Sequence, residues 1–365
     1  MKLGCAIYPE YHDYSTIEKY LTKLKKFGFK RIFISLLQIN DAETFTKYQK
    51  ILEFLNNEDF QVVADVNPDV LNRLGWSEDL IGKLNNYGIN IIRLDEAPSL
   101  KYLAELTHNN HGVKIELNMS THPEILRELI EMGADKNNIT GSHNFYPKRY
   151  TGLSERHFKE MTKFFRDYEV ETSAFVNSPC SNEGPWPLAE GLCTLEDHRY
   201  KNLNYQINYF KALGNIDNVI VANQFMSEEE MKLLSEAVEK PVTFQAQLLN
   251  DISPIEKEIV ESMHVYRGDI SHYVIRSSNS RVKYANSDIK PIKQSKQVHK
   301  GDIMIDNNLY KRYKGELQIA LTPFEVSDKT NIVGQIDSDY IPLLENLKPW
   351  ANFKFDMGND IKWME

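Results

Sequence analysis

The first two-thirds of the chain repeat one pattern, in which a short hydrophobic run is followed by a polar turn and an amphipathic stretch with helical spacing. The runs are rich in β-branched residues, as buried strands are. The expected strands are Leu3–Tyr8, Arg31–Leu36, Gln61–Val66, Ile91–Asp95, Val113–Met119, Ile139–Phe145, Glu171–Asn177 and Asn218–Gln224. About eight strands that alternate with helices within about 240 residues predict an α/β fold, a closed (β/α)8 TIM barrel.

Helix boundaries are marked in the stretches between these strands. The Ser/Thr-x-x-Glu spacing of a capping box is a signal for the start of a helix. It recurs at Ser15 with Glu18, at Thr121 with Glu124 and at Ser227 with Glu230. Glycine often ends a helix because it adopts the left-handed backbone conformation readily. The glycines expected in this role are Gly28, Gly88 and Gly133.

A doubly wound open sheet is the alternative architecture for such an alternation. Open sheets of that kind often carry a glycine-rich, phosphate-binding turn after the first strand. Here the first strand ends instead in Tyr8-Pro9-Glu10. The barrel is therefore the preferred interpretation.

The pattern changes after Pro241, where short alternating runs are separated by turn residues. The expected strands there are Thr243–Leu248, Tyr273–Arg276, Gln318–Leu321 and Asn331–Ile336, and one helix-like segment spans Ile341–Leu347. A chain of 365 residues also exceeds the size at which one hydrophobic core stops growing. We therefore predict a barrel domain over residues 1–240 and a smaller all-β domain, itself a barrel, over residues 241–365.

Composition excludes several classes of partner. The chain has 43 Lys and Arg residues against 52 Asp and Glu residues, a formal net charge of -9, which disfavours a nucleic-acid-binding surface. Its three cysteines are too few for a disulfide framework, so we expect a reducing compartment. No run approaches the roughly 18 apolar residues of a membrane helix. We expect a cytoplasmic protein with no nucleic-acid or membrane partner.

Polar residues close almost every predicted barrel strand, and the carboxyl ends of the strands are where barrel enzymes place their active sites. These residues are Glu10, Gln38, Asp65, Asn67, Asp95, Glu96, Glu116, Asn118, His143, Asn144, Asn177, Asn223 and Gln224. No lysine is among them, which disfavours a Schiff-base aldolase, and no His-x-His pair supports a metal site. Pairs of carboxylates remain, and these are the groups that cleave glycosidic bonds. We expect neither a metal nor a cofactor.

We predict that Asp95 and Glu116 form the catalytic pair, with Glu10 and Asp65 as the next candidates. Each also has a structural explanation. Asp95 shares a strand face with Arg93 and would pair with it. Glu116 would fill a polar layer of the barrel, Asp65 would cap the next helix, and Glu10 would be solvated.

The residues predicted to bind substrate divide by chemistry. Those suited to sugar hydroxyl groups are Asn118, His143, Asn144, Tyr146, Asn177 and Gln224. Those suited to an anion are Lys148, Arg149, Arg267 and Arg276, since guanidinium groups match phosphate and carboxylate oxygens. The long loop from Ser178 to Thr194 is expected to cover the site, and its Trp186 would either stack on a sugar or pack in the fold.

Several motifs together resemble the MupG-like 6-phospho-N-acetylmuramidases. They are Gly4-Cys5-Ala6-Ile7-Tyr8-Pro9-Glu10, Arg93-Leu94-Asp95, Glu116-Leu117-Asn118-Met119-Ser120, His143-Asn144-Phe145-Tyr146-Pro147, Thr151-Gly152-Leu153, Arg267-Gly268-Asp269-Ile270 and Val274-Ile275-Arg276-Ser277. The resemblance spans nearly the whole chain. It implies a barrel followed by a cyclophilin-like β-domain, with the site between them. One departure from the family pattern, Glu96 in place of a small residue, leaves open whether Asp95 or Glu96 faces the pocket.

The resemblance also implies an activity, the exo-acting hydrolysis of N-acetylmuramic acid 6-phosphate from N-acetylglucosamine in the recycling of cell-wall fragments. The substrate would be a phosphorylated amino-sugar disaccharide. A phosphosugar isomerase or epimerase and a non-catalytic phosphosugar-binding protein remain alternatives. The sequence leaves open the roles within the carboxylate pair, the choice among retention, inversion and substrate assistance, and the formation of a homodimer.

Overall fold

The computed structural model describes residues 1–94, 99–181, 183–185 and 190–357. The chain divides into two compact units. The first comprises Met1–Ile207 and Asn215–Val238, and the second comprises Asn208–Gly214 and the chain from Glu239 onward. Each unit is described by itself.

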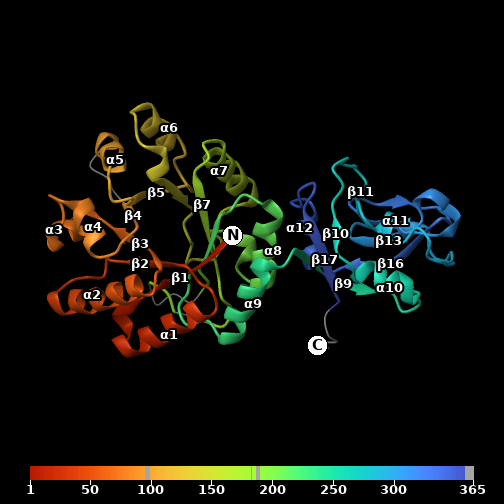
Figure 1. Cartoon of the computed structure of the whole chain (residues 1–365), viewed down its shortest axis with the longest axis horizontal. Coiled ribbons are helices and arrows are strands. Elements are labelled where there is room, and N and C mark those ends of the chain that lie inside the picture. The colour runs from red at the N-terminus through yellow and green to blue at the C-terminus, as the bar shows by residue number, and fades with distance from the viewer. Residues whose placement is uncertain (95–98, 182, 186–189, 358–365) are drawn as a thin grey trace. The chain divides into compact units, whose positions relative to one another are not determined.

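The first unit is built on a closed barrel of eight parallel strands in which each strand pairs with its neighbours in chain order (Figure 1). The strands are β1 (Lys2–Ile7), β2 (Arg31–Ser35), β3 (Gln61–Val66), β4 (Ile91–Leu94), β5 (Lys114–Asn118), β6 (Ile139–Ser142), β7 (Glu171–Val176) and β8 (Asn218–Val221). Pairing of β1 with β8 closes the barrel. The predicted (β/α)8 barrel is confirmed, and the open sheet is excluded.

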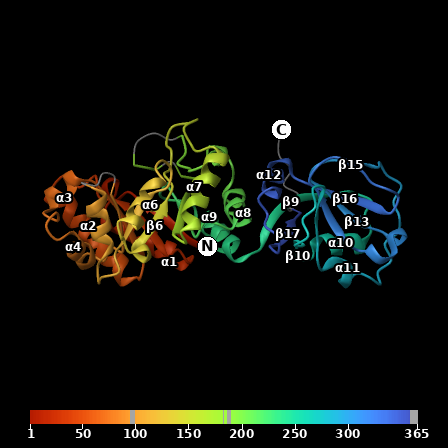
Figure 2. The same cartoon turned by 90° about the horizontal axis from the view of Figure 1, so that it is seen from above.

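The helices lie around the outside of these strands (Figure 1). Figure 2 shows the same cartoon after a turn of 90°. The helices are α1 (Tyr14–Lys26), α2 (Ala42–Asn57), α3 (Pro68–Leu74), α4 (Leu80–Asn86), α5 (Leu100–Thr107), α6 (Glu124–Glu131), α7 (Glu155–Asp167), α8 (Leu203–Leu213) and α9 (Glu228–Glu239). Short 3-10 turns are η1 (Pro9–Tyr11), η2 (Lys136–Asn138) and η3 (Glu196–His198). Gly28, Gly88 and Gly133 have φ values of 81°, 69° and 88°, as expected for glycines that end helices.

Two of the three predicted capping boxes are wrong. The carboxylate of Asp13 accepts a hydrogen bond from the Thr16 amide at 2.8 Å, so α1 begins before Ser15. Pro123 precedes α6 without a side-chain cap, because its fixed φ already suits a helix start. Ser227 and Glu230 do bond reciprocally at the start of α9, with both distances 3.1 Å.

Side chains fill the barrel, so its interior is a core rather than a channel. One buried hydrophobic cluster comprises Ala6, Tyr8, Phe33, Val63, Ile91, Phe175, Ile220 and Ala222 from the strands, and Leu192 from the segment after β7. Strand residues two apart share a face, so the same faces carry Asp65 beyond Val63 and Arg93 beyond Ile91. Asp65 and Arg93 therefore follow the core toward the carboxyl ends of the strands.

The second unit contains a seven-stranded sheet in the order β10-β17-β9-β16-β13-β14-β11. Its strands are β9 (Val242–Leu248), β10 (His264–Val265), β11 (Val274–Arg276), β13 (Asp302–Asp306), β14 (Leu317–Ala320), β16 (Thr330–Ile336) and β17 (Asn352–Asp356). A bridge between Tyr266 and Ser277 brings the two edges together, so the sheet is nearly a closed barrel. The four strands predicted here are confirmed as β9, β11, β14 and β16.

Smaller elements complete the second unit. A two-stranded sheet pairs β12 (Gln297–Val298) with β15 (Phe324–Glu325). The helices are α10 (Pro254–Glu261), α11 (Ser280–Lys283) and α12 (Ile341–Leu344), and the 3-10 turns are η4 (Asn308–Tyr313) and η5 (Ser338–Tyr340). The all-β prediction missed α10, although its start carries a complete capping box of Ser253 and Glu256.

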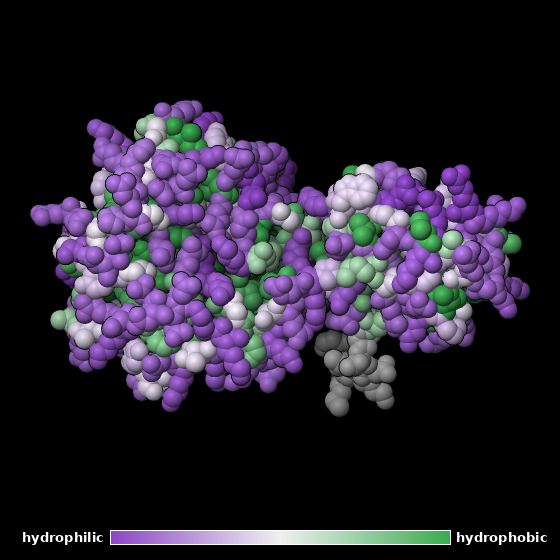
Figure 3. Space-filling view, in the orientation of Figure 1, coloured by the Kyte–Doolittle hydropathy of each residue, from purple (hydrophilic) through white to green (hydrophobic). Residues whose placement is uncertain are grey.

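Hydrophilic residues cover most of the face drawn in Figure 3, and hydrophobic residues are scattered among them in small patches. Across the described parts of the chain, no helix combines the length and the apolarity needed to cross a membrane.

Candidate functional site

Glu10 lies on η1, the tight turn that follows β1 at the mouth of the barrel. Its Oε2 accepts a hydrogen bond from the Tyr48 hydroxyl at 2.9 Å. Its Oε1 is buried and accepts no hydrogen bond from any described residue. Burial raises the pKa of Glu10 above its usual range. A carboxyl group with a raised pKa and one unengaged oxygen is equipped to hold and deliver a proton.

Tyr8 connects the end of β1 to the end of β8. Its hydroxyl donates to the carbonyl of Ala222 at 2.6 Å, and its amide donates to Gln224 Oε1 at 2.5 Å. Burial raises the pKa of Tyr8, and neighbouring groups that include Glu10 and Asp65 raise it further. The negative charges of Glu10 and Asp65 both raise the pKa of the Tyr8 hydroxyl, so these two predicted carboxylates lie near the same side chain.

The segment after β7 adds another carboxylate, Glu183. Its Oε2 lies 2.7 Å from His12 Nε2 and 3.5 Å from Gln224 Nε2, and its carbonyl accepts from the Gln224 amide at 2.9 Å. These contacts join the end of β8 to the loop after β1. Sequence reasoning missed Glu183, although it lies within the long loop predicted to cover the site. Gln224, predicted to bind substrate, is buried and holds Tyr8 and Glu183 in place.

Glu116 lies inside the barrel and has no exposed side-chain surface. Its Oε2 bonds to the guanidinium of Arg31, which is equally buried. Its Oε1 lies 3.8 Å from Arg93 Nη1, and Arg31 lies 3.8 Å from Glu171 Oε1. These ion pairs favour a structural role, in the polar layer named above as the alternative for Glu116.

Arg93 is a residue that the predicted site lacked. It donates to the carbonyl of Ser142 at 3.2 Å and to Oδ1 of Asn144, and its guanidinium also approaches Glu116. Arg93 therefore orients Asn144, a predicted substrate ligand. Its place in a motif with Asp95 was the available signal.

The other predicted amides are held by backbone groups. Asn118 Oδ1 accepts from the Ser120 amide at 2.8 Å. Asn177 Oδ1 accepts from the Leu192 amide at 2.9 Å, and Asn177 is buried. Each of these amides retains its NH2 group as a donor.

His143 is turned away from the barrel interior. Its Nε2 lies 2.9 Å from Thr162 Oγ1 on α7, its Nδ1 lies 3.3 Å from Ser120 Oγ, and its ring packs on Phe158. Burial lowers the pKa of His143 to about 3. A neutral, fully buried ring between the sheet and α7 favours a packing role over contact with a sugar.

A cavity of about 570 Å3 lies beside the carboxyl end of β7. Its lining comprises Arg149, Asn177, Ser178, Pro179, Ser181, Glu190, Gly191, Arg199 and Tyr200. Arg149 lies 3.0 Å from Glu190 Oε1, and Arg199 donates to the carbonyls of Tyr146, Glu190 and Gly191. Of the predicted ligands, Arg149 and Asn177 share this cavity, Tyr146 is half-buried beside it, and Lys148 is exposed.

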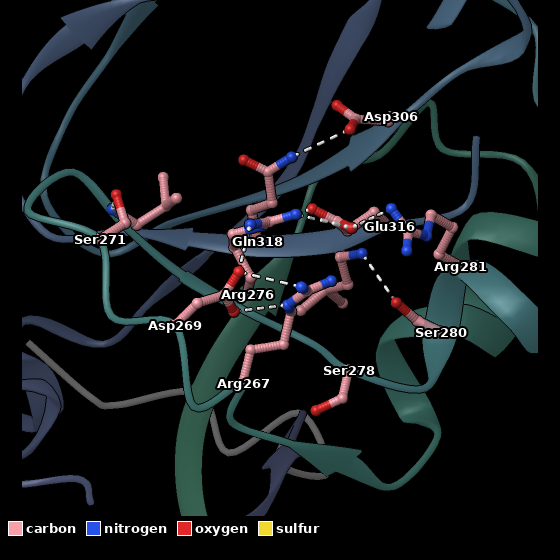
Figure 4. Close-up of polar contacts among 12 residues, drawn as sticks. Arg267, Asp269, Ser271, Arg276, Ser278, Ser280, Arg281, Asp306, Glu316 and Gln318 are labelled. Carbon is pink, nitrogen blue, oxygen red and sulfur yellow. Dashed lines mark hydrogen bonds and ion pairs between the residues drawn. The ribbon is translucent and has the colours of Figure 1, made fainter. Parts of the chain in front are cut away.

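The predicted cations of the second unit, Arg267 and Arg276, both contact Asp269 (Figure 4). Arg267 binds the Asp269 carboxylate through two nitrogens, at 2.7 and 2.9 Å, and Arg276 Nη1 lies 3.4 Å from the same group. Arg276 also bonds to Glu316 at 2.7 and 3.3 Å. Glu316 is only 2% exposed and lies 3.6 Å from Arg281, so a buried carboxylate fixes the position of Arg276.

Three residues named above, Asp95, Glu96 and Trp186, lie outside the described residues. Their predicted roles therefore remain expectations.

Two family models together match nearly the whole chain. The N-terminal model of 6-phospho-N-acetylmuramidase matches residues 3–236, and the C-terminal model matches residues 242–356. The chain belongs to the 6-phospho-N-acetylmuramidase family. Membership supports a glycosidase role.

Two solved structures are similar to this chain over nearly its whole length. An uncharacterized B. cereus protein is 33% identical over 97% of this chain and 99% of its own, with a TM-score of 0.86. A conserved protein of unknown function from Enterococcus faecalis is 24% identical over 99% of this chain and 98% of its own, with a TM-score of 0.70, which shows the shared fold. No curated protein matches the chain significantly.

The motifs that carry the family resemblance coincide with the contacts described above. Tyr8-Pro9-Glu10 forms the turn at the barrel mouth. In His143-Asn144, the His143 ring packs against α7 and the Asn144 amide contacts Arg93. Arg267-Gly268-Asp269 forms the charged cluster of the second unit. In this member of the 6-phospho-N-acetylmuramidase family, these motifs therefore contain both a carboxyl group with a raised pKa and a pair of arginines.

Proposed function

We propose that this protein hydrolyses the bond between N-acetylmuramic acid 6-phosphate and N-acetylglucosamine, as an exo-acting enzyme. The observation that carries the proposal is Glu10, a partly buried carboxyl group with a raised pKa at the mouth of a barrel that belongs to this family. Glycosidases need a proton donor for the leaving oxygen, and burial favours the protonated form of a carboxyl group.

Glu10 would act as the general acid, and a second carboxylate would attack the anomeric carbon or activate water. Asp65 is the partner that the described contacts support, because it faces the barrel interior and shares the neighbourhood of Tyr8. Asp95, the partner predicted first, stays a proposal from the sequence. Glu116 is assigned to the ion pairs that hold the barrel together, and Asn118 and Asn144 would donate or accept hydrogen bonds with the sugar.

The substrate carries a phosphate and a lactyl carboxylate, and we assign its anionic part to Arg267 and Arg276. Both guanidinium groups already bind a carboxylate, that of Asp269. Asp269 is 56% exposed, so it can give way to a ligand anion, whereas the buried Glu316 keeps Arg276 in position. The nearly closed sheet of this unit supports the cyclophilin-like fold expected for it, and a place in cell-wall recycling in the cytoplasm follows from the substrate.

Arg267→Gln and Asp269→Asn should change the Michaelis constant in opposite directions. Loss of the Arg267 fork should raise KM about tenfold, because charge-assisted hydrogen bonds contribute about 1.5–3 kcal/mol. Removal of the competing Asp269 carboxylate should lower KM about two- to fivefold, the range of an exposed ion pair. In both variants kcat should change little. If both variants keep the wild-type KM, these arginines do not bind the substrate.

The decisive experiment is incubation of the purified protein with the phosphorylated disaccharide and analysis of the products. Release of two sugars, N-acetylmuramic acid 6-phosphate and N-acetylglucosamine, is expected. A single isomerised product would indicate an isomerase or epimerase. Binding without any product, at substrate concentrations above the dissociation constant, would indicate a phosphosugar-binding protein.

A further inference from the structure

Trp350 is an exposed indole in a strained backbone conformation. The residue is 68% exposed, and its φ is 67°, in the left-handed region that bulky residues rarely adopt. The strained backbone is held by hydrogen bonds, since the Trp350 amide donates to the Tyr266 carbonyl at 2.8 Å and the Tyr266 amide donates to the Ala351 carbonyl at 3.0 Å. Strain of this kind costs about 1–3 kcal/mol and gathers at functional sites.

The indole lies directly against Gly268, the residue between Arg267 and Asp269. A side chain on Gly268 would begin only 2.4 Å from Trp350 Cζ2, so the ring occupies the space that a larger residue there would need. The amide of Arg267 donates to the carbonyl of Arg276 at 3.0 Å, which ties this segment to β11. The ring therefore packs on the segment that carries Arg267, and a backbone hydrogen bond joins this segment to Arg276.

Packing on Gly268 uses only a small part of the Trp350 surface, and the positive φ disfavours a bulky residue at this position. Most of the surface of Trp350 stays exposed, so the residue gains little of the stability that burial of a large apolar side chain ordinarily provides. A glycine at residue 350 would relieve the strain, because glycine adopts positive φ freely. A flat, exposed aromatic ring beside a pair of anion-binding arginines suits a ligand with one apolar face and one anionic group.

We propose that Trp350 is a sugar-stacking residue, whose ring packs against the C–H face of a pyranose while Arg267 and Arg276 bind the anionic substituent of that sugar. The partial negative charge of an aromatic face favours the C–H groups of the sugar. The ligand class is an anionic amino sugar, and the inference rests on the proposed function because that function supplies such a sugar.

The test measures binding of N-acetylmuramic acid 6-phosphate, the proposed product, to the full-length chain. Calorimetry should show about tenfold weaker binding to Trp350→Ala and Trp350→Gly, and Trp350→Phe should bind within a few-fold of wild type. The indole N–H signal of Trp350 is identified by NMR as the one that is absent from Trp350→Phe. In the wild type, this signal should shift upon addition of the sugar. Tyr310→Ala removes an exposed aromatic group of the same unit that contacts Tyr313, and it should bind normally.

Trp350→Gly separates binding from folding. Relief of the positive φ should leave its thermal unfolding temperature equal to or above that of the wild type, while binding is lost. Wild-type affinity in both Trp350→Ala and Trp350→Gly would overturn the proposal. If the disaccharide is hydrolysed but these variants keep the wild-type KM, the proposed function stands and the stacking role fails. If no hydrolysis occurs but the Trp350 variants bind the sugar more weakly than the wild type, the stacking role stands and the proposed function fails.

Discussion

Glu10→Gln should lower kcat by about 10²–10⁴-fold, the usual loss when a general acid is removed. Glutamine keeps the size of the side chain and can still accept from the Tyr48 hydroxyl, but it has no proton to deliver to the leaving oxygen. Affinity for the product sugar should stay within a few-fold of the wild type. The rate of disaccharide hydrolysis and a calorimetric binding curve check the two statements separately.

The pH profile gives an independent readout of the same residue. Burial raises the pKa of Glu10, so the protonated, active form persists above the pH at which an ordinary glutamate ionises. The rate should fall as the pH rises through this raised pKa, and that limb should be missing in Glu10→Gln. Glu43→Gln, a change on the exposed first turn of α2, is the matched control and should keep the wild-type profile.

A substrate with a good leaving group identifies the role of Glu10. An aryl glycoside of the phosphosugar needs little protonation at the departing oxygen, so Glu10→Gln should cleave it at nearly the wild-type rate. If Glu10→Gln keeps more than about a hundredth of the activity on the disaccharide, the general acid is another carboxylate, with Asp65 and Asp95 next to be tested.

Alternation of polar and hydrophobic residues was enough to predict the barrel. All eight strands were placed within a few residues, because each carries a hydrophobic run between clear helix signals. Capping was less predictable, since Asp13 and Ser15 are both good N-cap residues and only the course of the preceding loop decides between them. Ion pairs in the second unit were also not predictable, because their partners are distant in sequence. Arg276, for example, pairs with Glu316.

The candidate site was predicted less well than the fold because strand alternation does not fix depth within a barrel. Glu116 does face inward, but the stagger of the strands brings Arg31 from the start of β2 to meet it. His143 follows the last residue of β6, where the neighbouring Asn144 contacts the interior Arg93 instead. Glu10 was treated as a reserve because the sequence does not reveal its burial behind Tyr48.

Arg31→Met should destabilise the fold by about 3–5 kcal/mol, the usual cost of removing one partner of a buried ion pair. Arg31 and Glu116 have no exposed side-chain surface, so the change leaves the Glu116 carboxylate buried beside Arg93 alone, at 3.8 Å. A loss of this size is a large share of the roughly 5–15 kcal/mol that stabilises a typical protein. Chemical denaturation followed by circular dichroism measures it. Lys101→Met, which breaks an exposed ion pair with Glu105 on α5, should cost less than about 1 kcal/mol.

The double variant Arg31→Met, Glu116→Leu decides between the two roles considered for Glu116. Replacement of both charges by apolar side chains removes the unpaired carboxylate, so most of the lost stability should return. Because the proposed general acid, Glu10, lies on the turn after β1 and bonds to Tyr48 rather than to this buried ion pair, the refolded barrel should also hydrolyse the disaccharide at a rate within a few-fold of the wild type. A double variant that is stable yet slower by 10²-fold or more would return Glu116 to the catalytic pair, since a purely structural residue is dispensable once the fold has been restored.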